Sequence, residues 1–77
     1  MWQETEQGLY REFAFKDFIE AFAFMTRVAA AAEQAQHHPH WENTYNKVQI
    51  WLNTHEAGNS ITDKDRALAA AIDELVQ

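Results

Sequence analysis

The chain has 77 residues, 47% of them hydrophobic, no cysteine, and 12 acidic against 6 basic side chains. A chain of this length forms one domain, predicted here over residues 1–77, and it buries only about 60% of the surface that its unfolded form exposes. The net charge of −6 argues against nucleic-acid or anionic-membrane partners, and the chain has neither a signal-peptide pattern nor about 18 consecutive apolar residues. We therefore expect a cytoplasmic oligomer that buries its surplus apolar surface against copies of itself.

The N-terminal segment predicts a β-hairpin. Residues 2–6 and 9–15 have the pattern of two strands, and Gly8 between them supplies the positive φ that a tight connection needs. Arg11 interrupts the otherwise apolar face of the second strand.

A long helix is predicted over residues 17–36, with Asp17 as its N-cap and Glu20 as the capping-box partner. Two apolar stripes run along it, one of Phe18, Phe22, Met25, Ala29 and Ala32, the other of Ala21, Phe24, Val28, Ala31 and Ala35. The outward polar line of Glu20, Arg27 and Gln34 is narrow, so we expect this helix to meet a second partner, such as the same helix of another subunit.

A second hairpin is predicted over residues 41–45 and 48–54, turning near Asn46 and Lys47. Alternation in the later strand turns Trp51 away from the main core. The inward positions of that strand are Val48, Ile50 and Leu52.

The last helix begins at Thr62, with Asp65 in the capping-box position. Its predicted inner face consists of Leu68, Ala71, Ile72 and Leu75. The element order β-β-α-β-β-α predicts an α+β fold, in which a four-stranded antiparallel sheet carries two helices on one face.

Three of the four histidines lie close together, at His37, His38 and His40. Pro39 cannot continue a helix and pushes the residue before it towards extended geometry, so two adjacent imidazoles are held at the corner between helix and strand. His55 ends the following strand. If the second hairpin folds back on itself, His55 lies beside His37 and His38.

Three interpretations of these histidines compete. They could be solvated side chains near a helix C-terminus, where imidazole interacts well with the helix dipole. They could bind a metal through His37, His38 and His55, with Glu33 or Glu56 as a carboxylate ligand, although adjacent histidines rarely converge on one ion. They could instead perform metal-free acid/base chemistry, since imidazole exchanges protons near neutral pH, and a pair of histidines suits dehydration. The sequence shows no serine elbow and no glycine-rich phosphate loop.

Several motifs together resemble the pterin-4a-carbinolamine dehydratase family. They are FKDF at residues 15–18, FMTRVA at 24–29, EQAQHHPHW at 33–41, YNKV at 45–48 and LNTHE at 52–56. The resemblance covers nearly the whole chain, and the combination is specific although each piece alone is weak.

The resemblance implies a hydro-lyase that dehydrates 4a-hydroxytetrahydropterin to quinonoid dihydropterin, as 4a-hydroxytetrahydrobiopterin dehydratase does in tetrahydrobiopterin recycling. The family's catalytic histidines fall on His37, His38 and His55, which would take a proton from N5 and protonate the departing 4a-hydroxyl. Which histidine does which stays open. The implied substrate-binding residues are Glu33, Gln36, Pro39, Trp41, Asn53, Thr54 and Glu56. The pterin is the substrate, and neither a metal nor a further cofactor is implied.

The family also implies homodimers formed by joining sheets, and homotetramers formed through the long helix. Mammalian relatives serve as dimerisation cofactors of a homeodomain transcription factor, so a non-catalytic scaffold is the alternative function. Family members usually have an extra N-terminal helix, which this chain does not show, and Gln36 stands where vertebrate-like members have an acidic residue. Trp41 could stack on the pterin or anchor the strand, and a capping role accounts for Asp65 as well as a catalytic one does.

Overall fold

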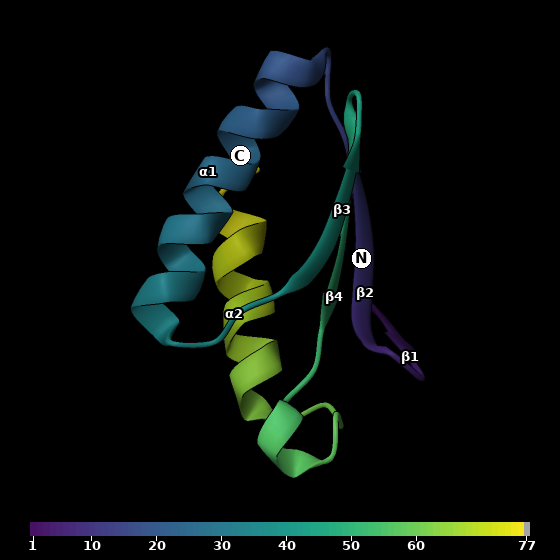
Figure 1. The fold of residues 1–77 in the computed structure, drawn as a ribbon, viewed down its shortest axis with the longest axis vertical. Helices are drawn as coiled ribbons and strands as arrows, with labels where there is room; N and C mark the ends of the chain where they lie inside the picture. Colours follow the sequence, from purple (N-terminus) through teal and green to yellow (C-terminus); the bar gives the residue numbers. More distant parts are fainter. Residues whose placement is uncertain (77) are drawn as a thin grey trace.

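An antiparallel sheet with both helices on one face forms within residues 1–76, the part of the chain that this computed structural model describes (Figure 1). The strands are β1 (Gln3–Thr5), β2 (Gly8–Ala14), β3 (His40–Thr44) and β4 (Lys47–Leu52), in the spatial order β1-β2-β4-β3. The helices are α1 (Phe18–Ala35) and α2 (Asp63–Glu74), and a short 3₁₀ turn, η1 (His55–Ala57), follows β4. The predicted α+β class and element order are confirmed, and Gln77 of the predicted domain lies outside the described residues.

Gly8 closes the first hairpin with a φ of 121°. A Cβ atom at this position would lie 2.1 Å from the carbonyl oxygen of Leu52, so glycine is required by space as well as by backbone conformation.

The predicted end of the fourth strand is wrong by two residues, because the chain leaves the sheet after Leu52. Thr54 instead makes an isolated bridge to Ser60, and His55 begins η1 rather than ending a strand.

Helix α1 begins and ends at residues that satisfy its free backbone groups. The Asp17 carboxylate accepts the N–H of Glu20 at 2.9 Å, as predicted. The return bond differs, since Glu20 accepts the N–H of Lys16 at 3.0 Å rather than that of Asp17. At the other end Gln36 adopts the left-handed conformation, with a φ of 53°, and its backbone N–H donates to the carbonyl oxygens of Ala32 and Glu33 in the last turn. The helix therefore ends at Ala35, and only Gln36 separates it from the two adjacent histidines.

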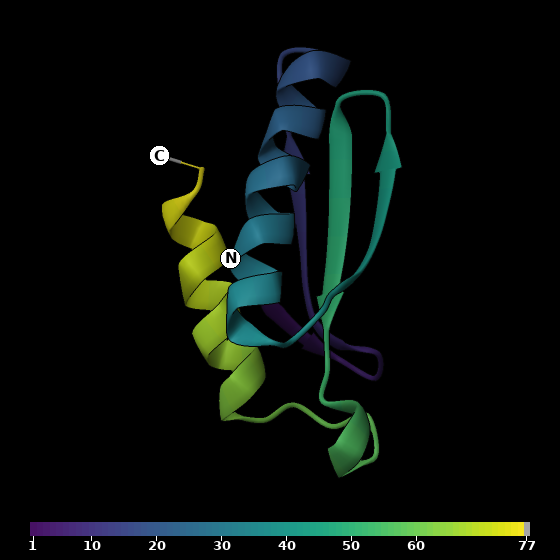
Figure 2. The same ribbon diagram turned by 60° about the vertical axis from the view of Figure 1, so that its left-hand side comes forward.

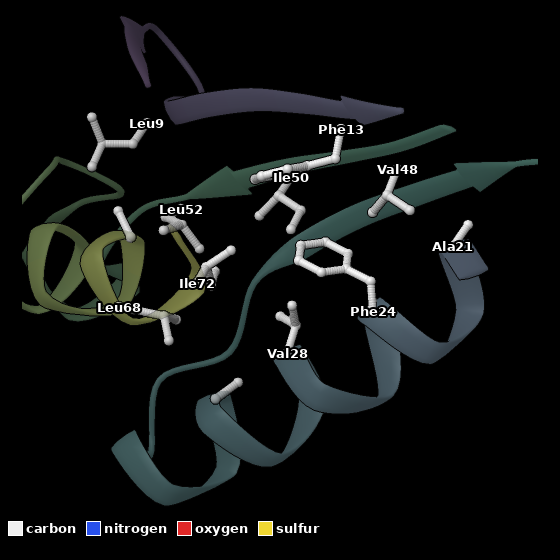
Figure 3. Close-up of a cluster of buried hydrophobic side chains, with 12 residues drawn as sticks. Leu9, Phe13, Ala21, Phe24, Val28, Val48, Ile50, Leu52, Leu68 and Ile72 are labelled. Carbon is white, nitrogen blue, oxygen red and sulfur yellow. The ribbon is translucent and has the colours of Figure 1, made fainter. Parts of the chain in front are cut away.

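The core lies between the sheet and the two helices (Figure 3). Its largest members are Phe24 and Val28 of α1, Leu68 and Ile72 of α2, Leu9 and Phe13 of β2, and Val48, Ile50 and Leu52 of β4. Arg11 is tolerated on this face because its guanidinium pairs with Asp73 at 2.6 Å and lies 4.6 Å from the centre of the Phe13 ring.

The helix faces differ in part from the prediction. Ala71 of α2 is exposed, and Ala69 is buried in its place. On α1 the sheet buries Ala21, Phe24, Val28 and Ala32, while Phe18 and Phe22 remain 46% and 55% exposed. Trp51 points to the helix-free face, as predicted, because it alternates with the buried positions of β4.

Side-chain hydrogen bonds connect the last helix to the N-terminal part of the chain. Its N-terminus has the predicted capping box between Thr62 and Asp65. Near its other end, Asp73 accepts hydrogen bonds from the Trp2 indole at 2.8 Å and from Arg11. Figure 2 shows α2 alongside α1, on the same side of the sheet. Among the described residues, neither helix is long and apolar enough to cross a membrane.

Candidate active site

Two segments that are distant in sequence meet beside the end of β4. One is the turn that leaves α1 and the other is the start of η1, which lies at the lower end of the molecule in Figure 1. Between them is a cavity of about 230 Å³, lined by Gln36, His37, His38, Asn53, His55 and Glu56. The structure thus brings together the three histidines that the sequence analysis singled out.

His37 is the buried member of the group, with 8% of its surface exposed. Its backbone N–H donates to Ala32 at 3.1 Å, and its Nε2 lies 2.6 Å from Oδ1 of Asp65. Asp65 is fully buried, and its other oxygen accepts the hydroxyl of Thr54 and the N–H of Thr62, each at 2.8 Å. The same carboxylate therefore caps α2 and fixes the His37 ring.

The surroundings of Asp65 decide its charge. Burial alone would raise the pKa of Asp65, but the hydrogen bonds from His37, Thr62 and Thr54 outweigh burial and hold this pKa below its ordinary value. The ionised carboxylate can only accept hydrogen bonds, so Nε2 of His37 carries the hydrogen of that contact. Nδ1 is then the ring nitrogen of His37 that remains for a substrate.

The other two histidines are exposed. Nε2 of His38 lies 2.9 Å from the Glu33 carboxylate, which comes from the last turn of α1. Nδ1 of His55 lies 3.3 Å from the side-chain oxygen of Asn59. The cavity therefore combines one fixed, buried imidazole with two that water and ligands can reach, and imidazole is the side chain most often used for general acid/base catalysis.

Glu56 adds negative charge at the mouth of the cavity. Its own backbone N–H lowers the pKa of Glu56 most, and the nearby Lys64 lowers it further. Its exposed carboxylate is thus available as a hydrogen-bond acceptor.

Four of the residues predicted to bind substrate do not line the cavity. Thr54 is buried behind it, where it donates to Asp65. Glu33 pairs with His38, and Pro39 is half-buried in the turn. Trp41 packs against the hydrophobic core, which favours the interpretation that it anchors the strand.

The sequence analysis missed the contact between Asp65 and His37. The sequence position of Asp65 could have indicated this contact, because Asp65 shares the inner face of α2 with Leu68 and Ile72, where an acidic residue requires a partner.

No group of three or more His, Asp or Glu side chains in residues 1–76 is arranged to hold a metal ion. His40 faces away from the cavity and lies against Trp51, with 5.2 Å between the ring centres.

Comparison with known proteins places the chain in a family. The family model described as Pterin 4 alpha carbinolamine dehydratase matches residues 1–75. The chain belongs to this family. A relative from Synechococcus sp. (strain WH7803) is 55% identical over 74 residues, which are 96% of this chain and 78% of the relative. A relative from Paraburkholderia xenovorans is 51% identical, with 96% and 78% covered. Both relatives are provisionally named pterin-4-alpha-carbinolamine dehydratases.

Two solved structures share the fold of this chain. The crystal structure of a transcriptional coactivator/pterin dehydratase from Brucella melitensis has a TM-score of 0.91 and 38% identity, and the match covers 99% of this chain and 82% of the other. A pterin dehydratase-like protein, titled a RuBisCO assembly factor in the alpha-carboxysome, has a TM-score of 0.80 and 28% identity, with 96% and 87% covered. The fold therefore occurs in proteins with different titles.

Proposed function

We propose that this chain dehydrates 4a-hydroxytetrahydropterins to quinonoid dihydropterins, as a cytoplasmic hydro-lyase in tetrahydrobiopterin recycling. The observation that carries the proposal is the convergence of His37, His38 and His55 on one small cavity. Family membership adds the pterin as the class of substrate.

The reaction needs two proton transfers and no covalent intermediate. The N5–H bond and the C4a–O bond break, a C4a=N5 double bond forms, and water leaves. One histidine removes the proton from N5 while another protonates the departing hydroxyl, which suits imidazoles that approach the same bicycle from different segments. His37, held by Asp65, supplies a nitrogen at a fixed position, while His38 and His55 can adjust to the substrate.

The rest of the cavity suits the flat, polar edge of a pterin. The amino and N3–H groups of its pyrimidine ring are donors, and the ionised Glu56 carboxylate is a matching acceptor. Gln36 and Asn53 line the same space. The proposal includes neither a metal nor a cofactor, so dialysis against a chelator should leave the dehydration rate unchanged, and recovery of a lost rate on adding zinc would contradict it.

A dehydration assay tests the proposal. We expect a His38→Ala, His55→Ala double variant to lose at least about 100-fold in turnover, since general acid/base groups contribute about 10²–10⁴-fold each. Gln34→Ala, an exposed change on the last turns of α1 outside the cavity, is the matched control. Equal rates for the wild type and the double variant would reject the proposal.

We also propose that the working form is a homodimer or homotetramer. The supporting observation is the group of large apolar side chains that α1 leaves exposed, Phe18, Ile19 and Phe22. Side chains of this kind, side by side on one element, are typical of a surface that contacts a partner.

The second candidate function is a non-catalytic scaffold on the same fold. The structural similarity to a protein titled a RuBisCO assembly factor favours it, together with the exposed face of α1. Calorimetric titration with pterins separates the two functions, because a scaffold would show no binding at about millimolar concentration, whereas a dehydratase must bind.

A further inference from the structure

A second depression adjoins the histidine cavity on the helix-free face of the sheet. It has a volume of about 580 Å³ and lies over the end of β4 and the turn between β1 and β2. Asn53 lines both spaces, and Asn59, which lines the depression, is hydrogen-bonded to His55 of the cavity. A ligand in the histidine cavity therefore has the depression as its immediate neighbour.

The depression offers a fixed aromatic surface. Trp51 lines it and is held between two other rings, with centre distances of 5.1 Å to Tyr10 and 5.2 Å to His40. Because Trp51 is half-exposed, it presents apolar area to a ligand without having to rearrange.

The charge of the depression is negative. Glu6 and Glu42 line it, and no Lys or Arg among residues 1–76 does so. The whole chain has a net charge of −6, so the field of the molecule adds to that of the two carboxylates.

The size of the histidine cavity limits what it can hold. Its volume of about 230 Å³ is below the roughly 300–1,000 Å³ of typical ligand sites, so it suits the pterin bicycle without its substituent. That substituent is attached at C6, which is bonded to the reacting atom N5. It must therefore leave the bicycle beside the histidines, where the depression begins.

We infer that the depression over Trp51 receives the C6 substituent of the substrate, and that Glu6 and Glu42 select neutral hydroxyalkyl substituents over anionic ones. This inference rests on the proposed function for the identity of the bicycle. It assigns two tasks, in which Trp51 contacts the substituent and the two carboxylates repel negative charge.

Calorimetric binding of three stable pterins to the full chain tests the inference. They are unsubstituted pterin, a pterin with a 6-dihydroxypropyl group, and 6-carboxypterin. Trp51→Leu should lower the ratio of the dihydroxypropyl-pterin affinity to the unsubstituted-pterin affinity by about fivefold or more, because stacking and apolar contact are lost. An unchanged ratio would overturn the role of Trp51.

The charge selection has its own variant. Replacing both carboxylates, Glu6→Gln and Glu42→Gln, should raise the affinity for 6-carboxypterin relative to the dihydroxypropyl pterin by about three- to tenfold at low salt, and less at high salt. Glu12→Gln is the matched control, because Glu12 lies on the same sheet face, near Lys47, and outside the depression. An equal effect of Glu12→Gln, or no effect of the double variant, would overturn the selection.

The outcomes separate this inference from the proposed function. If the wild type dehydrates a carbinolamine but both affinity ratios stay unchanged in the variants, the inference is wrong and the dehydratase stands. If the ratios change as expected while no carbinolamine is dehydrated, the substituent site stands and the catalytic proposal is wrong. If the wild type binds none of the three pterins, both are rejected.

Discussion

Asp65 joins the start of α2 to the histidine cavity. The buried carboxylate accepts one bond that caps the helix, one from Thr54 and one from His37. Every buried side-chain nitrogen and oxygen in residues 1–76 has a hydrogen-bond partner. Removing one of these bonds leaves a buried polar group without a partner, which lowers the free energy of unfolding.

Asp65→Asn should therefore affect both activity and stability. The amide cannot hold His37 as the ionised carboxylate does, so we expect turnover to fall by about 10- to 100-fold, with a changed pH profile. We expect the free energy of unfolding to fall by about 1–3 kcal/mol. The control is Asp63→Asn, which alters an exposed residue of the same helical turn. A loss of stability with an unchanged rate and pH profile would show that Asp65 only caps the helix.

Asp65 should also make the free energy of unfolding depend on pH in the acidic range. Its folded-state pKa lies below the ordinary value of 3.8, so the folded protein binds this proton less readily than the unfolded chain does. The carboxylate thus contributes stability above about pH 4, and the contribution is lost as pH falls through the lower folded-state pKa. Urea unfolding should show the difference between wild type and Asp65→Asn shrinking below about pH 4. A difference that persists unchanged to about pH 2 would contradict this.

At the scale of elements, the contact between the first hairpin and the end of β4 leaves no space for a side chain at Gly8. Gly8→Ala would combine an unfavourable φ of 121° with a clash against Leu52. We expect it to cost about 2 kcal/mol or more. Gly58→Ala is the control, because its φ is also positive, at 73°, but beyond its two neighbours in sequence no atom of the described chain lies within 4 Å of the added Cβ. It should cost about 1 kcal/mol. If chemical denaturation showed equal losses in the free energy of unfolding for the two variants, a steric clash at Gly8 would be excluded as the cause.

The elements themselves could be predicted because their signals are local. The cap at Asp17, the alternation that turns Trp51 outward and the capping box at Thr62 each depend on residues a few positions apart. The end of β4 could not be predicted this way, because Thr54 leaves the sheet to bridge Ser60 and to donate to the buried Asp65. That choice depends on the packed structure and not on strand propensity.

The candidate site followed the same division. The meeting of His37, His38 and His55 could be expected from the hairpin between them. The contact of His37 with Asp65 spans 28 positions and joins the turn after α1 to the first turn of α2, so neither helix pattern alone contains it. Trp41 has the aromatic character of a stacking residue, and its packing against the core became evident only from the position of β3.

At the scale of the whole molecule, α1 leaves the apolar side chains of Phe18, Ile19 and Phe22 exposed, which is where the proposed oligomer would bury surplus hydrophobic surface. A double change, Phe18→Glu and Phe22→Glu, places charge where we expect a partner subunit. It should shift the protein to a lower mass in light scattering or sedimentation while the far-ultraviolet circular dichroism stays the same.

Ala70→Glu, on an exposed position of α2, is the control for that change. The same mass for the wild type and both variants would count against an interface on this face of α1. A lower mass with Ala70→Glu as well would indicate a general effect of added charge.

The bonds between the two ends of the chain have a consequence for protein synthesis. Trp2 and Arg11 reach Asp73, and Glu4 pairs with Arg66 at 3.0 Å. Leu68 and Ile72 of α2 complete the core. While α2 is still inside the ribosome, the first hairpin has no partner for these groups, and its apolar face is open to water. Folding must therefore wait until α2 has left the ribosome, when contacts between residues far apart in the sequence can close together.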